Sequence, residues 1–297
     1  MRATPPELSA ILDAVRREDR AQALALSLAG WRAGSRHPLV LMLAAEGLQV
    51  SGEGAQAVAL LELALEATDD PEVWRRYGAA LAMQDRHADA IAAFEEALDI
   101  DPKDVRALSL AGGVSFQTGE LAAAEDYYGR ALALDPLNLD ALRGAAAAAV
   151  RRKAPAQAAD LARRVLAAAP EDLSAAMTLI RADLLEARET SAAASATALL
   201  ARPDLADDAR LALHDLRAEA FDALDRPAEA FADYAARNAL SERQAAPHLA
   251  AMGERRLDQA RRLARVFLDT DREAWQGSCG PDLEGAETAA GHVFLIG

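Results

Sequence analysis

Two apolar faces within one short stretch constrain the fold of this chain more than any other feature. Residues 71–104 read PEVWRRYGAALAMQDRHADAIAAFEEALDIDPKD. Apolar or small residues recur there at helical spacing in two groups, which Asp85 and Arg86 separate. Pro102 ends the second group because a proline lacks the amide proton and its ring clashes with the preceding turn. The pattern therefore predicts two short helices. Their facing residues are Trp74, Tyr77, Gly78 and Leu81 in the first and Ala90, Phe94 and Ala97 in the second.

The sizes of these residues indicate how the two helices would pack. Gly78 and Ala90 are small enough for the helix backbones to approach closely. Trp74, Tyr77 and Phe94 are large enough to fill the space between this pair and the next one. We therefore expect Trp74 and Phe94 to be largely buried.

The same pattern recurs with a period of about 34 residues, which indicates a repeat protein. Further units begin near residues 4, 38, 105 and 139. Two degenerate units begin at Leu173 and Leu211, the second after a short insertion around Asp207. Together with residues 71–104 this makes about seven units.

The pattern of residue sizes resembles the consensus of the tetratricopeptide repeat family. That consensus runs large, large, small, large in the first helix and small, aromatic, small, proline in the second. The resemblance implies an all-α fold, in which paired helices stack as a right-handed superhelix, or α-solenoid. We expect this array to cover residues 4–240, with residues 71–172 matched best.

Helix capping gives a separate signal at the same boundaries. The residues that end four successive units are Asp70, Asp104, Asn138 and Asp172. A short side-chain oxygen at such a place accepts from the free amides of the next helix. Pro155 and Pro227 fall in the first turn of second helices, where a missing amide costs nothing. The caps and the apolar period agree on the repeat boundaries.

Composition supports a helical chain and excludes several function classes. The residues are 52% hydrophobic but only 4% aromatic, so alanine and leucine, both strong helix formers, dominate. A net charge of −15 argues against nucleic-acid binding, which needs a basic surface. The sequence has no run long enough to span a membrane and an N-terminus unlike a signal peptide, so a cytoplasmic protein is expected.

The residue types that usually carry chemistry are scattered. Cys279 is the single cysteine and nothing cationic flanks it, so neither a disulfide nor a thiolate metal site is expected. The five histidines show no metal-ligand spacing. We therefore expect no metal, no catalytic residue and no cofactor site within this chain.

A basic column on the first helices gives the candidate binding site. In the tetratricopeptide fold the first helix of each pair lines a concave groove. The residues mapped to that groove are Arg75, Met83, Arg106, Phe116, Gln117, Arg143 and Arg181. Such a groove would hold an extended, acidic polypeptide through guanidinium–carboxylate pairs. The alternative is that these arginines are solvated surface, because arginine is frequent throughout the chain.

The last part of the sequence resembles a second family. Residues 241–275 are expected to form an amphipathic helix that caps the array, and residues 276–290 a linker. Residues 291–297, GHVFLIG, have the apolar pattern of a buried parallel strand. Array, FADYAARNAL (residues 231–240), Arg-rich helix, linker and strand follow one another as in bacterial tetratricopeptide–sulfotransferase proteins. In those proteins a loop after this strand binds phosphoadenosine phosphosulfate (PAPS).

Two roles follow from these resemblances. In the first, the array is the recognition arm of a PAPS-dependent sulfotransferase, and the chain is cut at the first strand of the catalytic domain. In the second, it is a stand-alone cytoplasmic adaptor with no enzymatic domain. Both roles predict a protein or peptide partner, and neither predicts nucleic acid, membrane or metal.

Overall fold

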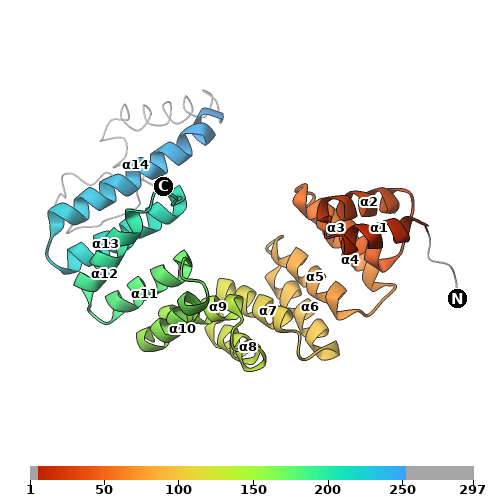
Figure 1. Ribbon diagram of the computed structural model, residues 1–297, viewed down its shortest axis with the longest axis horizontal. Helices are drawn as coiled ribbons and strands as arrows, with labels where there is room; N and C mark the ends of the chain where they lie inside the picture. The colour runs from red at the N-terminus through yellow and green to blue at the C-terminus, as the bar shows by residue number, and fades with distance from the viewer. Residues whose placement is uncertain (1–5, 252–297) are drawn as a thin grey trace, which may run out of the picture. The chain divides into compact units, whose positions relative to one another are not determined.

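The computed structural model describes residues 6–251, and every regular element among them is an α-helix. The helices follow one another in pairs joined by short loops (Figure 1). In chain order they are α1 (Pro6–Arg16) and α2 (Arg20–Arg32), α3 (Pro38–Val50) and α4 (Gly54–Leu65), α5 (Pro71–Ala82) and α6 (His87–Ile100), α7 (Val105–Thr118) and α8 (Leu121–Leu134), α9 (Leu139–Arg151) and α10 (Pro155–Ala168), α11 (Leu173–Leu185) and α12 (Glu189–Leu200), and α13 (Asp207–Ala223) and α14 (Pro227–Ala251).

The helix pairs stack in the order of the sequence. From α1 to α13 each helix packs against the next, and from α3 to α13 the first helices of successive pairs also touch one another directly. The first helices therefore form one layer and the second helices another. The chain divides after Tyr234 into two compact units, and this stack belongs to the first of them. The right-handed superhelix expected from the sequence stays a prediction.

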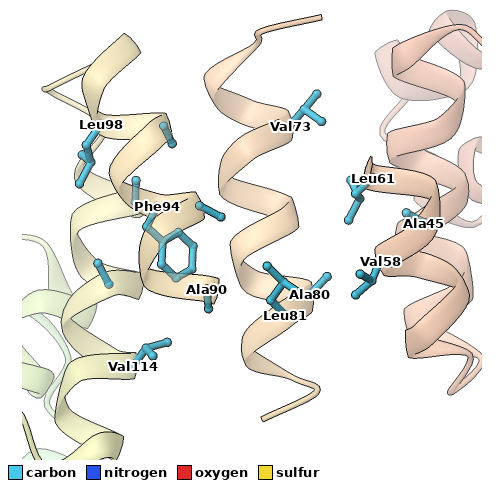
Figure 2. Close-up of a cluster of buried hydrophobic side chains, with 14 of the residues drawn as sticks. Ala45, Val58, Leu61, Val73, Ala80, Leu81, Ala90, Phe94, Leu98 and Val114 are labelled. Carbon is cyan, nitrogen blue, oxygen red and sulfur yellow. The ribbon is translucent and has the colours of Figure 1, made fainter. Parts of the chain in front are cut away.

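In the central helix pairs, aromatic rings pack directly against glycines of neighbouring helices. Phe94 on α6 is fully buried (Figure 2), and a Cβ at Gly78 on α5 would lie 2.7 Å from its ring. Tyr128 on α8 occupies the same place in the next pair. A Cβ would come within 2.7 Å of its ring at Gly112 and within 2.1 Å at Gly144. These separations are shorter than carbon atoms tolerate, so the close approach of the helices requires glycine at these positions.

The predicted helix caps are confirmed. Asp70, Asp104, Asn138 and Asp172 each accept a hydrogen bond from a backbone amide in the first turn of the following helix. Pro155 and Pro227 begin α10 and α14, as expected. The array of helix pairs follows the predicted period, and Phe94 is buried as predicted. Trp74 is only partly buried, because its indole Nε1 lies at the surface and donates to Asp69 Oδ1 at 2.9 Å.

Two features near the end of the array take a helical form. The residues around Asp207, expected as a short insertion, form the first turn of α13, which at 17 residues is longer than the 13-residue α11. Helix α14 runs unbroken from Pro227 to Ala251, so the expected boundary at residue 240 falls inside a helix. The rest of the predicted capping helix to residue 275, the linker at 276–290 and the strand at 291–297 lie outside the described residues. None of the described helices combines the length and apolar character needed to cross a membrane.

Candidate functional site

A basic hollow of about 460 Å³ opens on the layer of first helices. Helices α3, α5 and α7 supply most of its lining, and four of its ten lining residues are arginines. The lining residues are Arg20, Met42, Glu46, Gln49, Leu61, Arg75, Arg76, Ala79, Arg106 and Leu110. The four guanidinium groups outnumber the three carboxylates that contact them, Glu46, Glu72 and Asp104, so this place is locally basic in a chain of net charge −15.

An apolar hollow of about 420 Å³ adjoins the basic one. The two hollows share Ala79 on α5 and Leu110 on α7, so they adjoin between these helices, and we call the two together the valley. The lining residues of the apolar hollow are Ala79, Ala82, Met83, Phe94, Ser109, Leu110, Gly113, Val114 and Gln117. Met83 is 65% exposed, so its side chain is accessible on this surface.

The valley has the same polarity on both of its walls. On α5 the basic Arg75 and Arg76 come first and the apolar Met83 follows about two turns later. On α7 Arg106 comes first and Val114 follows. The amino-terminal ends of both helices therefore form the basic half, and their carboxyl-terminal ends form the apolar half.

Most guanidinium groups in the basic hollow already have carboxylate partners. Glu46 accepts from Arg20 Nε at 2.7 Å and from Arg76 Nη1 at 2.5 Å. Burial alone would raise the pKa of Glu46, but these hydrogen bonds outweigh it and hold the pKa below its usual value. Arg75 Nε lies 3.1 Å from Asp104 Oδ2, and the same guanidinium pairs with Glu72.

Arg106 differs from the other arginines of the basic hollow. Its side chain is exposed, and it has no ion pair or side-chain hydrogen bond to any of residues 6–251. It occupies the second place of α7, and its exposed side chain lines the hollow. Arg106 is therefore the cation of this surface that is available to a ligand.

Two of the predicted groove arginines connect one repeat to the next. Arg143 Nε donates to Asp172 Oδ2 at 2.6 Å across 29 residues, and Arg75 contacts Asp104 at the same spacing. In the intervening repeat Ser109 Oγ lies 3.4 Å from Asn138 Oδ1. Each acceptor is the residue that caps the following first helix. These arginines hold the repeats in register, and their role in ligand binding stays a prediction.

The remaining predicted residues lie at three places. Met83 and Gln117 line the apolar hollow. Phe116 is covered by Arg151, whose guanidinium lies 4.8 Å from the ring centroid and donates to the Phe116 carbonyl at 2.7 Å. Arg181 is exposed at a separate hollow of about 240 Å³, together with Leu185 and Glu219.

A buried ionic cluster was not predicted from the sequence. Asp233 on α14 is 2% exposed and binds Arg217 through both carboxylate oxygens, at 2.6 and 2.8 Å. His214 Nδ1 lies 2.6 Å from Asp233 Oδ1 and must carry a proton, because an ionised carboxylate only accepts. Burial alone would raise the pKa of Asp233, but the bonds from Arg217 and His214 prevail and lower it. This ionic cluster joins α13 to α14. Among residues 6–251 no group of three or more side chains is arranged to hold a metal ion.

Comparison with known proteins supports the repeat assignment. Tetratricopeptide repeat family profiles match residues 71–104 and residues 112–172. No protein of curated function matches the sequence.

Several solved structures share the fold. A tetratricopeptide repeat protein from Parabacteroides merdae ATCC 43184 is 16% identical, with 79% of this chain and 91% of that chain covered and a TM-score of 0.59. PilW, a type IV pilus biogenesis factor, is 21% identical, with 68% and 92% covered and a TM-score of 0.60. A chain of the APC/C hetero-tetramer Cut9–Hcn1 is 13% identical, with 78% and 45% covered and a TM-score of 0.62.

Identities this low establish the fold alone, and the family profiles add the repeat signature in the centre of the chain. Residues 71–104 and 112–172 are therefore tetratricopeptide repeats, and the helix pairs stacked on either side of them continue the same fold.

Proposed function

We propose that the array is a cytoplasmic protein–protein interaction scaffold that binds an extended, acidic polypeptide along its layer of first helices. The observation that carries the proposal is the basic hollow, where four arginines gather in a chain of net charge −15. Such a contrast favours an acidic partner because opposite charges attract it to this place and like charges repel it elsewhere. The hetero-tetramer Cut9–Hcn1, which contains a chain of this fold, is consistent with a role in assembly.

The shape of the surface fits a polypeptide better than a small molecule. The basic and apolar hollows are open and adjoin along the lengths of α5 and α7. A third hollow with the exposed Arg181 lies on α11. Several shallow hollows on successive repeats suit a long ligand that touches each of them lightly.

Charge reversal at the unpaired arginines tests this proposal. We expect the Arg106→Glu, Arg181→Glu double variant to bind a fluorescein-labelled, glutamate-rich peptide at least about tenfold more weakly than the natural chain. Fluorescence anisotropy at low and physiological salt measures the affinity, which should fall with salt in the natural chain. Equal affinities would make both arginines solvated surface. Reversal of Arg75 or Arg143 is also expected to weaken binding, but it would break their ion pairs with Asp104 and Asp172 as well.

A narrower proposal is that the scaffold is the recognition arm of a PAPS-dependent sulfotransferase. It rests on the sequence of residues 231–297 alone, and neither the family profiles nor the solved structures lend it support. The codons that follow residue 297 in the gene test it. A Pro-Arg-Ser-Gly-Thr-Thr loop there would favour the arm, whereas a stop codon would favour the stand-alone adaptor. In either case this chain alone should bind no PAPS.

A further inference from the structure

One half of the valley between α5 and α7 is basic and the other is apolar. A ligand that fills both halves must therefore have an acidic part and an apolar part. The basic half ends in Arg106, which has no partner among the described residues, whereas Arg75 and Arg76 are ion-paired. The apolar half carries Met83, 65% exposed, and Leu110, 37% exposed. Because Ala79 and Leu110 line both hollows, one continuous segment can occupy both.

We propose that this valley recognises a two-part motif, an acidic side chain bound by Arg106 and an apolar side chain bound beside Met83 and Leu110. The inference rests on the proposed function and names the ligand of the same surface. The ionised Arg106 donates a charge-assisted hydrogen bond to the carboxylate, and no internal ion pair has to break. The apolar side chain removes Met83 and Leu110 from water.

The helix geometry sets the spacing of the motif. Roughly 10 Å of helix axis separates Arg106 from Gly113, which lies in the apolar hollow. An extended peptide advances about 3.3 Å per residue, so about three residues span the same distance. The acidic and the apolar residue should therefore stand two or three positions apart in the ligand.

Charge balance explains why the acidic residue belongs at Arg106 rather than deeper in the hollow. Three carboxylates contact the other three arginines of the hollow and balance their charge; the carboxylates are Glu46, Glu72 and Asp104, and the arginines are Arg20, Arg75 and Arg76. A ligand carboxylate placed among these groups would face the carboxylates that are already there. At Arg106 the ligand carboxylate forms an ion pair with a guanidinium that has no partner among the described residues.

A display library of random peptides tests the motif with the purified 297-residue chain. We expect the natural chain to enrich sequences with Asp or Glu two or three residues from Leu, Ile, Met or Phe. Arg106→Gln should lose the acidic preference and weaken an enriched peptide about tenfold, while the apolar preference stays. Met83→Ser should have the opposite effect, with the acidic preference retained.

Arg163→Gln is the matched control. Arg163 is an exposed arginine on α10, in the layer of second helices, so the variant makes the same charge change away from the valley. It should bind as the natural chain does, and melting curves check that all three variants fold.

The outcomes separate the motif from the scaffold. Enriched peptides without the acidic–apolar pair, or equal effects of Arg106→Gln and Arg163→Gln, would overturn the motif and leave the scaffold standing. No enriched peptide at all would overturn both. Salt-sensitive capture of random RNA that Arg106→Gln abolishes would also overturn the motif, because the ligand would then be a nucleic acid.

Discussion

The pair α5–α6 and the pair α13–α14 have the same architecture but close their interiors by opposite means. In α5–α6 the fully buried Phe94 presses against Gly78. In α13–α14 the buried Asp233 binds Arg217 and His214. The first contact is apolar and depends on shape, while the second depends on ionisation. Tyr234 has the same spacing in α14 as Phe94 has in α6, but it is 39% exposed, so in the last pair the ionic cluster is buried and this ring is not.

The two pairs also differ at their first amides. Asp70 caps α5 through its carboxylate, whereas Ala206 precedes α13 and offers no side-chain acceptor. Acidic residues Asp207 and Asp208 occupy the first turn of α13, where they interact favourably with the helix dipole. The distal pair thus relies on charge at its amino terminus as well as in its interior. This difference can be tested by substitutions at each contact.

The largest effect is expected from removal of the central ring. Phe94→Ala should lower the free energy of unfolding by about 3–5 kcal/mol, because the ring is fully buried and the cavity cannot collapse against two rigid helices. Urea denaturation followed by circular dichroism measures the change. Phe231→Ala is the control, since that ring is 73% exposed and its loss should cost under about 0.5 kcal/mol. Similar costs for the two variants would contradict the claim that the Phe94 ring stabilises the contact between α5 and α6.

Removal of the buried carboxylate should have the next largest effect. Asp233→Ala should cost about 3 kcal/mol at neutral pH, because Arg217 loses the partner for which it was desolvated. This cost lies at the lower end of the about 3–5 kcal/mol that breaking a buried ion pair usually takes, because Arg217 and His214 are partly exposed.

The cost of Asp233→Ala should depend on pH. The pKa of Asp233 in the folded chain lies below the ordinary value of about 3.9, so the unfolded chain takes up the proton first as the pH falls. The stabilisation is complete above that value and is lost as the pH falls through the folded pKa. The cost should therefore be constant from about pH 5 to 7 and shrink in more acidic solution. A cost that grows in acid would contradict the ionic cluster.

A smaller effect is expected from added volume at a helix contact. Gly112→Ala places a Cβ 2.7 Å from the Tyr128 ring and should cost about 1–3 kcal/mol. In a Tyr128→Ala background the same change should be neutral or stabilising, because alanine favours the helix once the ring is gone. Gly129→Ala on the open side of α8 meets no atom within 4 Å and should stabilise by about 0.5–1 kcal/mol. Additive effects of Gly112→Ala and Tyr128→Ala would exclude the contact.

The smallest change in stability is expected from substitutions at the residues that precede α5 and α13. Ala206 has the extended backbone of a capping residue, with φ −64° and ψ 151°, but no acceptor. Ala206→Ser should raise the free energy of unfolding by about 1 kcal/mol, and Asp70→Ala should lower it by a similar amount. Thermal unfolding detects both changes. No gain at residue 206 would mean that Asp207 and Asp208 already satisfy these amides.

The sequence predicted the fold well because the sizes of the residues in the repeat pattern determine how the helices of a pair pack. Gly78, Ala90 and Phe94 specify one helix pair, and the capping residues mark the boundary of each unit. In the last pair the ionic cluster was missed, although its buried apolar residues such as Leu213 and Ala230 follow the usual pattern. Asp233 and Arg217 look like surface residues in a pattern of apolar positions, and only the fold brings them together.

The candidate site was predicted in part. Helical spacing identified Arg75, Arg106, Met83 and Gln117, all of which line the valley. Spacing could not distinguish the ion-paired Arg75 from the unpaired Arg106, because the partner Asp104 belongs to the next repeat. The recurrence of 29 residues from Arg143 to Asp172 was present in the sequence and is the signal that reveals such links.

An environment-sensitive fluorophore in the valley tests the central claim most directly. Gln117→Cys with Cys279→Ser leaves one labelling site, because the chain has a single natural cysteine and Gln117 is exposed in the apolar hollow. A glutamate-rich peptide with leucine three residues after each acid should change the emission saturably, and the same peptide with glutamine for glutamate should bind at least about tenfold more weakly. Identical titrations by the two peptides, or no change with either, would contradict an acidic polypeptide ligand in this valley.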